Sequence, residues 1–343
     1  MLIKAMGAMM ERLGPIGIHF VGAAPKTTPG RDQVEAVYQQ MRRDFFVASP
    51  FVLHASIPGL LAGAWSLVRE SLFTGEVDRG KKEIIAWAIS RGNECPFCVD
   101  AHHAAVRAAE ADDAALSAWA EASARSGPLP PAPFDAPSES EKAEILATVV
   151  AFHYLNRMVS VFLDPKMMPI PDVMDPVAAR MAQFMMGGMI DKGRNNLPGE
   201  SLSLLPEHDA SLAWRPEWAR PRAVIADALA GWSALAEAEA QARLDPGLVA
   251  AVGAGIEQGR SEALATSDLV SEAAPLGLAL RAQAELALLA ARSPSRIDRA
   301  RIEPVKESGL DDKGLLTLVA WASSRAARQA ALRAAQSFES AAS

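Results

Sequence analysis

The pattern of hydrophobic and polar positions predicts helices along most of this chain. In its first third, apolar residues recur with helical spacing in five segments: 33–47, 59–73, 79–91, 96–110 and 112–125. After a proline-rich loop, Ser138 with Glu141 three residues later has the pattern of a capping box. It precedes a further helix of sequence EKAEILATVVAFHYLNRMVSVFL. Alanine-rich runs favour helix and alternating β-branched runs are few, so the predicted class is all-α.

Residues 164–221 differ from the chain on both sides. They contain many prolines, the turn pairs GG and NN, and seven of the thirteen methionines. This composition predicts a connector with one helix near 176–190. Helical periodicity returns at 222 and continues to the C-terminus. The chain therefore divides into a first domain over 1–163, a connector over 164–221 and a second helical part over 222–343.

The second helical part resembles the first at one place. Asp78–Arg91 reads DRGKKEIIAWAISR and Asp312–Arg325 reads DKGLLTLVAWASSR, with seven of fourteen positions identical at a constant offset of 234. Such identity indicates an internal duplication. At the same offset the second copy is degenerate, because it lacks the polar residues of the first. Thr317 stands opposite Glu83, Gln329 opposite Cys95, Leu332 opposite Cys98 and Gln336 opposite His102.

Composition and charge exclude several classes of protein. Of the 343 residues, 50% are hydrophobic and 22% charged, which excludes general disorder. The net charge of −7 argues against a nucleic-acid partner. We expect no signal peptide, because the N-terminus lacks a charged region, an apolar region and a cleavage site in that order. We also expect no membrane span, because no segment has about 20 continuous apolar residues. The expected location is cytoplasmic, where a cysteine pair is more often catalytic or metal-binding than a static crosslink.

Both cysteines of the chain lie in RGNECPFCVDAHH, residues 91–103, together with two of its six histidines. Gly92 and Asn93 are residues that often end a helix. Pro96 favours the first position of a new helix. The sequence therefore predicts a break between two helices immediately before the cysteine pair.

This break places several reactive groups together. Cys95 falls near the N-cap of the second helix and Cys98 in its first turn, where the helix dipole and free N–H groups favour a thiolate. His102 follows Cys98 by four residues, so the imidazole and the sulfur share one helix face. Glu83 lies on the preceding helix, twelve residues before Cys95. A carboxylate folded back beside His102 would orient the ring and raise its basicity.

Three other interpretations of these residues stay open at this point. Cys95, Cys98 and His102 could bind a structural zinc ion, although the second ligand pair of a closed site is not apparent. Two cysteines and a helix histidine could also occur together by chance. A purely structural disulfide would close a loop too short to remove much unfolded-state entropy. We expect no cofactor and no resident metal.

The same residues resemble a known family. Glu83, eleven intervening residues, the Cys95-x-x-Cys98 pair and then His102 resemble the active-site motif of the AhpD-like alkylhydroperoxidases, within the carboxymuconolactone decarboxylase superfamily. The flanking AWAISRGNECPFCVDAHHAAV is similar to the helix pair of that family. Downstream, AFHYLNRM at 151–158 resembles its helix with an asparagine–arginine end. The resemblance implies an AhpD-like helical fold.

The resemblance also implies a peroxidase cycle. Cys98 would be the peroxidatic thiolate that attacks the O–O bond and becomes a sulfenic acid, and Cys95 would resolve it as a disulfide. A dithiol donor would then reduce the disulfide, and Glu83 with His102 would relay the proton. In the best-known members a histidine stands between the cysteines, whereas this chain has Phe97. One polar element of the relay is therefore missing.

The resulting hypothesis is a thiol-dependent peroxidase, or a related thiol–disulfide oxidoreductase, with a hydroperoxide substrate and a dithiol electron donor. Its expected catalytic residues are Cys98, Cys95, His102 and Glu83, and its expected assembly is a homo-oligomer. One alternative is a redox-responsive binding or assembly protein with negligible turnover. The methionine-rich connector and the degenerate second copy favour it, because peroxidase chemistry needs neither. Another is a non-peroxidase member of the same superfamily.

Three further polar residues have predicted positions. His103 points away from the helix face that Cys98 and His102 share, which predicts an exposed or interface position. His153 and Asn156 lie on the predicted helix after the capping box. They either line a pocket beside the thiols or form a satisfied polar pair within that helix.

Overall fold

The computed structural model describes most of the chain: residues 7–9, 11–12, 15–22, 30–125, 127–166, 175–193, 195–257 and 277–341. Within these residues the structure is helical apart from loops and one isolated antiparallel bridge between Ile18 and Leu163. The predicted all-α class is confirmed for this part of the chain. The connector methionines at 167, 168 and 174 lie outside the described residues.

The helices of the first part begin and end close to their predicted positions. They are α2 (Arg31–Asp44), α3 (Ser49–Val52), α4 (Pro58–Val68), η1 (Arg69–Phe73), α5 (Arg79–Gly92), α6 (Pro96–Ala108), α7 (Ala114–Ala122) and α8 (Glu139–Phe162). One difference is that the helix predicted over 59–73 changes to a π-helical turn, η1, for its last five residues. The capping box at the start of α8 is present, because Ser138 and Glu141 each bond the other's backbone N–H.

The remaining helices follow the connector. They are α9 (Asp175–Gly193), α10 (Ala223–Arg243), α11 (Pro246–Glu257), α13 (Leu278–Arg292), α14 (Arg299–Glu307) and α15 (Asp312–Ala341). The described residues also contain four short 3-10 turns: η3 (Leu202–Leu204), η4 (Ala210–Leu212), η5 (Glu217–Ala219) and η6 (Pro294–Arg296). The single helix predicted near 176–190 therefore corresponds to α9.

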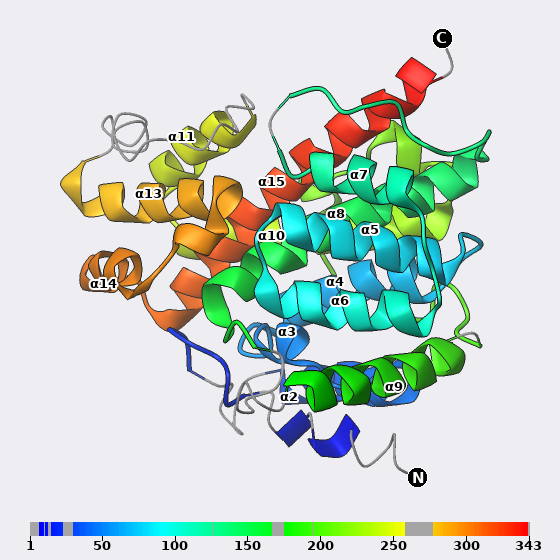
Figure 1. Cartoon of the computed structure of the whole chain (residues 1–343). Helices are drawn as coiled ribbons and strands as arrows, with labels where there is room; N and C mark the ends of the chain where they lie inside the picture. The colour runs from blue at the N-terminus through cyan, green and yellow to red at the C-terminus, as the bar shows by residue number, and fades with distance from the viewer. Residues whose placement is uncertain are drawn as a thin grey trace.

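Helix α8 lies at the centre of the molecule. It packs against α5 and α6 on one side and against α15 on the other. Figure 1 shows α7, α5, α6 and α9 in succession, with α8 behind α5 and the long α15 crossing the molecule. Helix α8 is the one described helix that is long and apolar enough to cross a membrane, and 94% of its apolar window is buried inside the protein. Burial against other helices gives it the environment of a core helix.

The two similar segments have different surroundings. Helix α5 ends at Gly92, whereas α15 continues without interruption from Asp312 to Ala341. Trp321 is fully buried on α15 and its Nε1–H donates to Glu237 at 3.0 Å, but Trp87 on α5 is only partly buried. The internal duplication and the domain boundaries therefore stay predictions.

Candidate active site

The break between α5 and α6 has the geometry of a Schellman motif. The Cys95 N–H donates to the Ser90 carbonyl at 3.0 Å, and the Glu94 N–H donates to the Arg91 carbonyl at 3.1 Å. The residue in the left-handed conformation is Glu94, with φ 54°, and not a glycine. Gly92 has a different role, because a Cβ there would lie 2.8 Å from the Glu121 carbonyl oxygen of α7. The predicted break is present, and Cys95 both completes the end of α5 and is the N-cap of α6.

The two cysteines are paired as a disulfide. Their Cα atoms lie 5.3 Å apart, and Cys98 sits in the first turn of α6 as predicted. Both are almost fully buried, Cys95 at 1% and Cys98 at 5% exposure. Val159 of α8 and Leu163, the residue after α8, belong to the same buried cluster, and Ile18 packs against it.

Glu83 and His102 form a hydrogen bond across the two helices, with Glu83 fully buried and His102 partly buried. The His102 Nδ1–H donates to Glu83 Oε2 at 2.7 Å, and Arg79 Nε donates to the other oxygen at 2.8 Å. Burial alone would raise the pKa of Glu83, but the charge of Arg79 and the bond from His102 lower it to about 2. The ionised carboxylate is an acceptor only, so it fixes the proton on Nδ1 and leaves Nε2 as the basic nitrogen.

Three of the four predicted site residues line one pocket. Cys98, His102 and Glu83 face it, whereas Cys95 does not. The pocket has a cavity volume of about 80 Å³ and is partly open to solvent. Its other walls are mainly apolar and include six phenylalanines: Phe45, Phe46, Phe51, Phe73, Phe97 and Phe152. A thiol, an imidazole and a buried carboxylate therefore meet at the edge of an apolar cavity.

Sequence reasoning missed Arg79 and the phenylalanine walls. Arg79 lies four residues before Glu83, a helical spacing at which opposite charges pair, so this signal was available. The phenylalanines come from segments far apart in the chain, and no local pattern connects them. Met186 shows that α9 of the connector also contributes to the lining.

The structure separates the two polar residues of α8. His153 lies away from the pocket, with Nε2 2.9 Å from Ser123 Oγ and Nδ1 close to Arg157 and Asn93. Burial, with the nearby positive charges of Arg157 and Arg333, lowers its pKa well below the ordinary value. Asn156 does line the pocket. The pocket interpretation therefore holds for Asn156 alone, and the two residues do not form a polar pair, because the partners of His153 are Ser123, Arg157 and Asn93.

His103 has the predicted exposed position. Its ring stacks on Trp87 at a centroid distance of 5.0 Å, on the side of α6 away from His102. Among the described residues, no group of three or more histidine, cysteine, aspartate or glutamate side chains is arranged to hold a metal ion.

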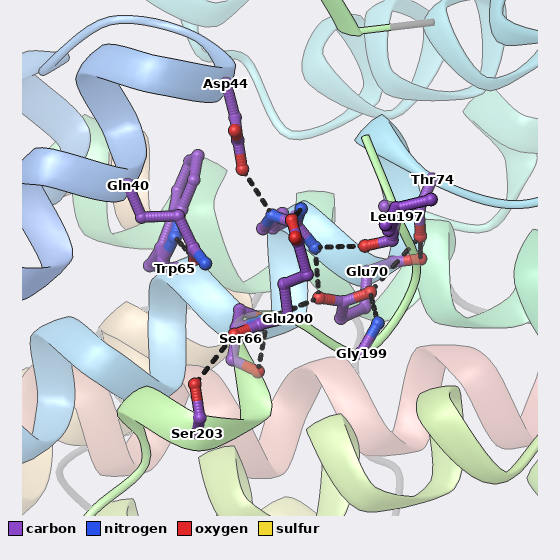
Figure 2. A network of polar contacts seen from close by, with 12 residues as sticks. Gln40, Asp44, Trp65, Ser66, Glu70, Thr74, Leu197, Gly199, Glu200 and Ser203 are labelled. Carbon is purple, nitrogen blue, oxygen red and sulfur yellow. Dashed lines mark hydrogen bonds and ion pairs between the residues drawn. The ribbon is translucent and has the colours of Figure 1, made fainter. Parts of the chain in front are cut away.

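A buried ion network holds the wall of the pocket opposite α8. Leu72 and Phe73 of η1 line the pocket, while Arg69 on the same turn is fully buried in the network. Arg69 donates to Asp44 at 2.7 Å and to Glu70 at 2.6 Å. Figure 2 shows this network, in which further bonds reach the segment before α10 through Leu197, Gly199, Glu200 and Ser201. It fixes η1 against a part of the chain about 130 residues away.

We predict that Glu83→Gln reduces stability at neutral pH but not in acid. The pKa of Glu83 is lowered from 4.5 to about 2, so its ionised form stabilises the fold above pH 4.5. This stabilisation, about 3 kcal/mol, is lost as the pH falls from 4.5 towards 2. Urea unfolding of the parent and of Glu83→Gln at several pH values measures this stabilisation. The difference in unfolding free energy should be constant above pH 5 and shrink below about 4.5; a difference that persists unchanged at about pH 3 contradicts the ion pair.

Comparisons with known proteins agree with this site. The sequence profile of the carboxymuconolactone decarboxylase family matches residues 59–127, which contain Glu83, both cysteines and His102. An alkyl hydroperoxide reductase of Mycobacterium tuberculosis is 29% identical over 334 residues, which cover 91% of this chain and 93% of that protein. No solved structure matches the chain. Residues 59–127 therefore resemble the carboxymuconolactone decarboxylase family, and most of the chain is similar to an alkyl hydroperoxide reductase.

Proposed function

We propose that this protein is a thiol-dependent peroxidase that reduces organic hydroperoxides through Cys98 and Cys95. The observation that carries the proposal is the meeting of Cys98 with the Glu83–His102 pair at the edge of an apolar pocket. The name of the mycobacterial relative, alkyl hydroperoxide reductase, supports the same reaction class. Cys95 supports it too, because it is bonded to Cys98 and lies outside the pocket, as a resolving thiol would.

The proposed cycle has three steps. The Cys98 thiolate attacks the terminal oxygen of the hydroperoxide, the O–O bond breaks, and Cys98 becomes a sulfenic acid while an alkoxide leaves and is protonated to the alcohol. The Cys95 thiol then displaces the hydroxyl of the sulfenic acid, which gives water and the disulfide. A dithiol donor finally reduces the disulfide and is itself oxidised.

His102 and Glu83 have distinct roles in this cycle. His102 Nε2 takes the proton of the Cys98 thiol and returns it to the departing alkoxide. Glu83 keeps Nδ1 protonated and stabilises the imidazolium that forms between these two events. Because the pKa of Glu83 is about 2, the carboxylate itself stays ionised throughout.

The lining of the pocket favours hydroperoxides with a large apolar group. Burying about 100 Å² of apolar surface contributes about 2.5 kcal/mol, whereas hydrogen peroxide has no apolar surface to bury. We therefore expect the kcat/KM for cumene hydroperoxide to exceed that for hydrogen peroxide by about ten-fold or more.

The experiment follows peroxide loss with excess dithiothreitol as the dithiol donor. Equal kcat/KM values for cumene hydroperoxide and hydrogen peroxide would contradict the proposed substrate class. No loss of either peroxide would contradict the peroxidase itself. A protein without peroxidase activity could still form and reduce the disulfide. If its oligomer mass, measured by size-exclusion chromatography, then differed between the oxidised and reduced forms, the redox-responsive binding protein would be favoured.

A further inference from the structure

Asn156 of α8 lines the same pocket as Cys98 and His102. The α8 residues that line the pocket have the spacing of one helix face: Phe152, Leu155, Asn156 and Val159. Phe152 contacts the His102 ring edge-on, with centroids 4.5 Å apart. Val159 packs in the cluster that contains Cys98. Asn156 lies within one turn of both on the same helix face, and its side chain is part of the pocket lining.

The amide of Asn156 is held by one bond and has one polar atom without a partner. Its Oδ1 accepts a hydrogen bond from Ser90 Oγ of α5 at 3.3 Å. The side chain is fully buried, yet Nδ2 has no hydrogen-bond partner. Leaving a buried donor unsatisfied costs about 1–3 kcal/mol, and such groups are rare in native structures. The neighbouring His153, which faces away from the pocket, has partners for both ring nitrogens. An unpartnered donor at a pocket wall points to an atom of a ligand.

We infer that Asn156 Nδ2–H binds the leaving oxygen of the hydroperoxide and stabilises the alkoxide as the O–O bond breaks; this inference rests on the proposed function. When the Cys98 thiolate attacks the terminal oxygen, negative charge develops on the oxygen that carries the organic group. A neutral amide donor stabilises this charge without giving up a proton. The proton that completes the alcohol comes from His102. The Ser90 hydroxyl, which donates to the Ala86 carbonyl at 2.6 Å and to Asn156 Oδ1 at 3.3 Å, orients the amide from α5.

The test compares two reactions of the same thiol. In reduced Cys95→Ser protein, Cys98 is oxidised once by cumene hydroperoxide or alkylated by iodoacetamide, which has no oxygen leaving group. Asn156→Leu keeps the approximate size of the side chain and removes the donor. We expect it to slow oxidation by about 10²–10³-fold while the alkylation rate changes less than about two-fold. Ser160→Ala is the matched control, because Ser160 Oγ on α8 also lacks a partner but lies outside the pocket lining. It should change neither rate.

A second readout separates charge stabilisation from a structural role. Peracetic acid releases acetate, a much better leaving group than the alkoxide of tert-butyl hydroperoxide. If Asn156 stabilises the leaving oxygen, Asn156→Leu should slow tert-butyl hydroperoxide strongly and peracetic acid only slightly. An unchanged oxidation rate in Asn156→Leu, or an equal loss for both peroxides and for iodoacetamide, overturns the inference. If the Cys95→Ser protein with Asn156 intact is alkylated but not oxidised by any peroxide, the proposed function itself fails.

Discussion

Replacing Cys98 with serine will stop peroxide turnover, whereas replacing Cys95 with serine will leave one oxidation per molecule. Cys98 lies in the first turn of α6 and lines the pocket beside His102. The helix N-terminus stabilises a thiolate there, and a serine hydroxyl stays protonated under the same conditions. We expect kcat/KM for cumene hydroperoxide to fall by about 10³-fold or more in Cys98→Ser, as when other catalytic nucleophiles are removed.

Cys95 is the matched control, since these are the two cysteines of the chain. In Cys95→Ser, Cys98 should reach the sulfenic acid once and then stop, because no thiol is left to displace the hydroxyl. Stoichiometric peroxide loss and trapping of the sulfenic acid with dimedone, located by peptide mass spectrometry, measure this. Two results would reverse the assigned roles. One is continued peroxide turnover in Cys98→Ser. The other is dimedone labelling of Cys95 in Cys98→Ser with no labelling of Cys98 in Cys95→Ser.

The helix pair that carries the cysteines was predictable because its signals are local. Asn93 and Pro96 lie next to the break, and the one-turn step from Cys98 to His102 needs only helical spacing. The same signals explain why the similar segment that begins at Asp312 is built differently. At the offset of 234, the residues opposite Gly92, Asn93 and Pro96 are all alanine. Alanine favours helix, so α15 continues where α5 ends.

The environment of the site could not be predicted in the same way. Arg69 and Glu200 are 131 residues apart, and the sequence pattern around 195–205 indicates only a connector. Helical periodicity identifies which face of a segment is buried, but it does not identify the segment that covers it. The apolar pocket depends on such pairings, because η1, α8 and α9 all contribute to its walls. The substrate preference therefore emerges only from the folded structure.

Replacing Arg69 with methionine should destabilise the protein more than any surface substitution. Arg69 is fully buried and bonds Asp44 and Glu70, which are also buried, as well as Glu200. Methionine fills similar space but leaves these carboxylates without their cation. Removing one partner of a buried ion pair costs about 3–5 kcal/mol. The measurement is the free energy of unfolding in urea at neutral pH.

Arg43 provides a matched control for this substitution. It contacts Asp44 and Glu200 as Arg69 does, but its side chain is 54% exposed. Water screens an exposed pair, so Arg43→Met should cost less than about 1 kcal/mol. If Arg69→Met and Arg43→Met reduced the free energy of unfolding by similar amounts, burial would not explain the stabilisation that the Arg69 network provides.

The network also links stability to the shape of the pocket. Burial alone would raise the pKa of Asp44, and the bonds from Arg43 and Arg69 hold it below the ordinary value. Without Arg69 the pKa of that carboxyl should rise, and its protonation removes the uncompensated charge, so the stability difference between Arg69→Met and the parent should shrink as the pH falls into the acid range. Leu72 and Phe73 lie on the same turn as Arg69 and line the pocket. The KM for cumene hydroperoxide should therefore rise in Arg69→Met, while the alkylation rate of Cys98 on α6 stays close to that of the parent.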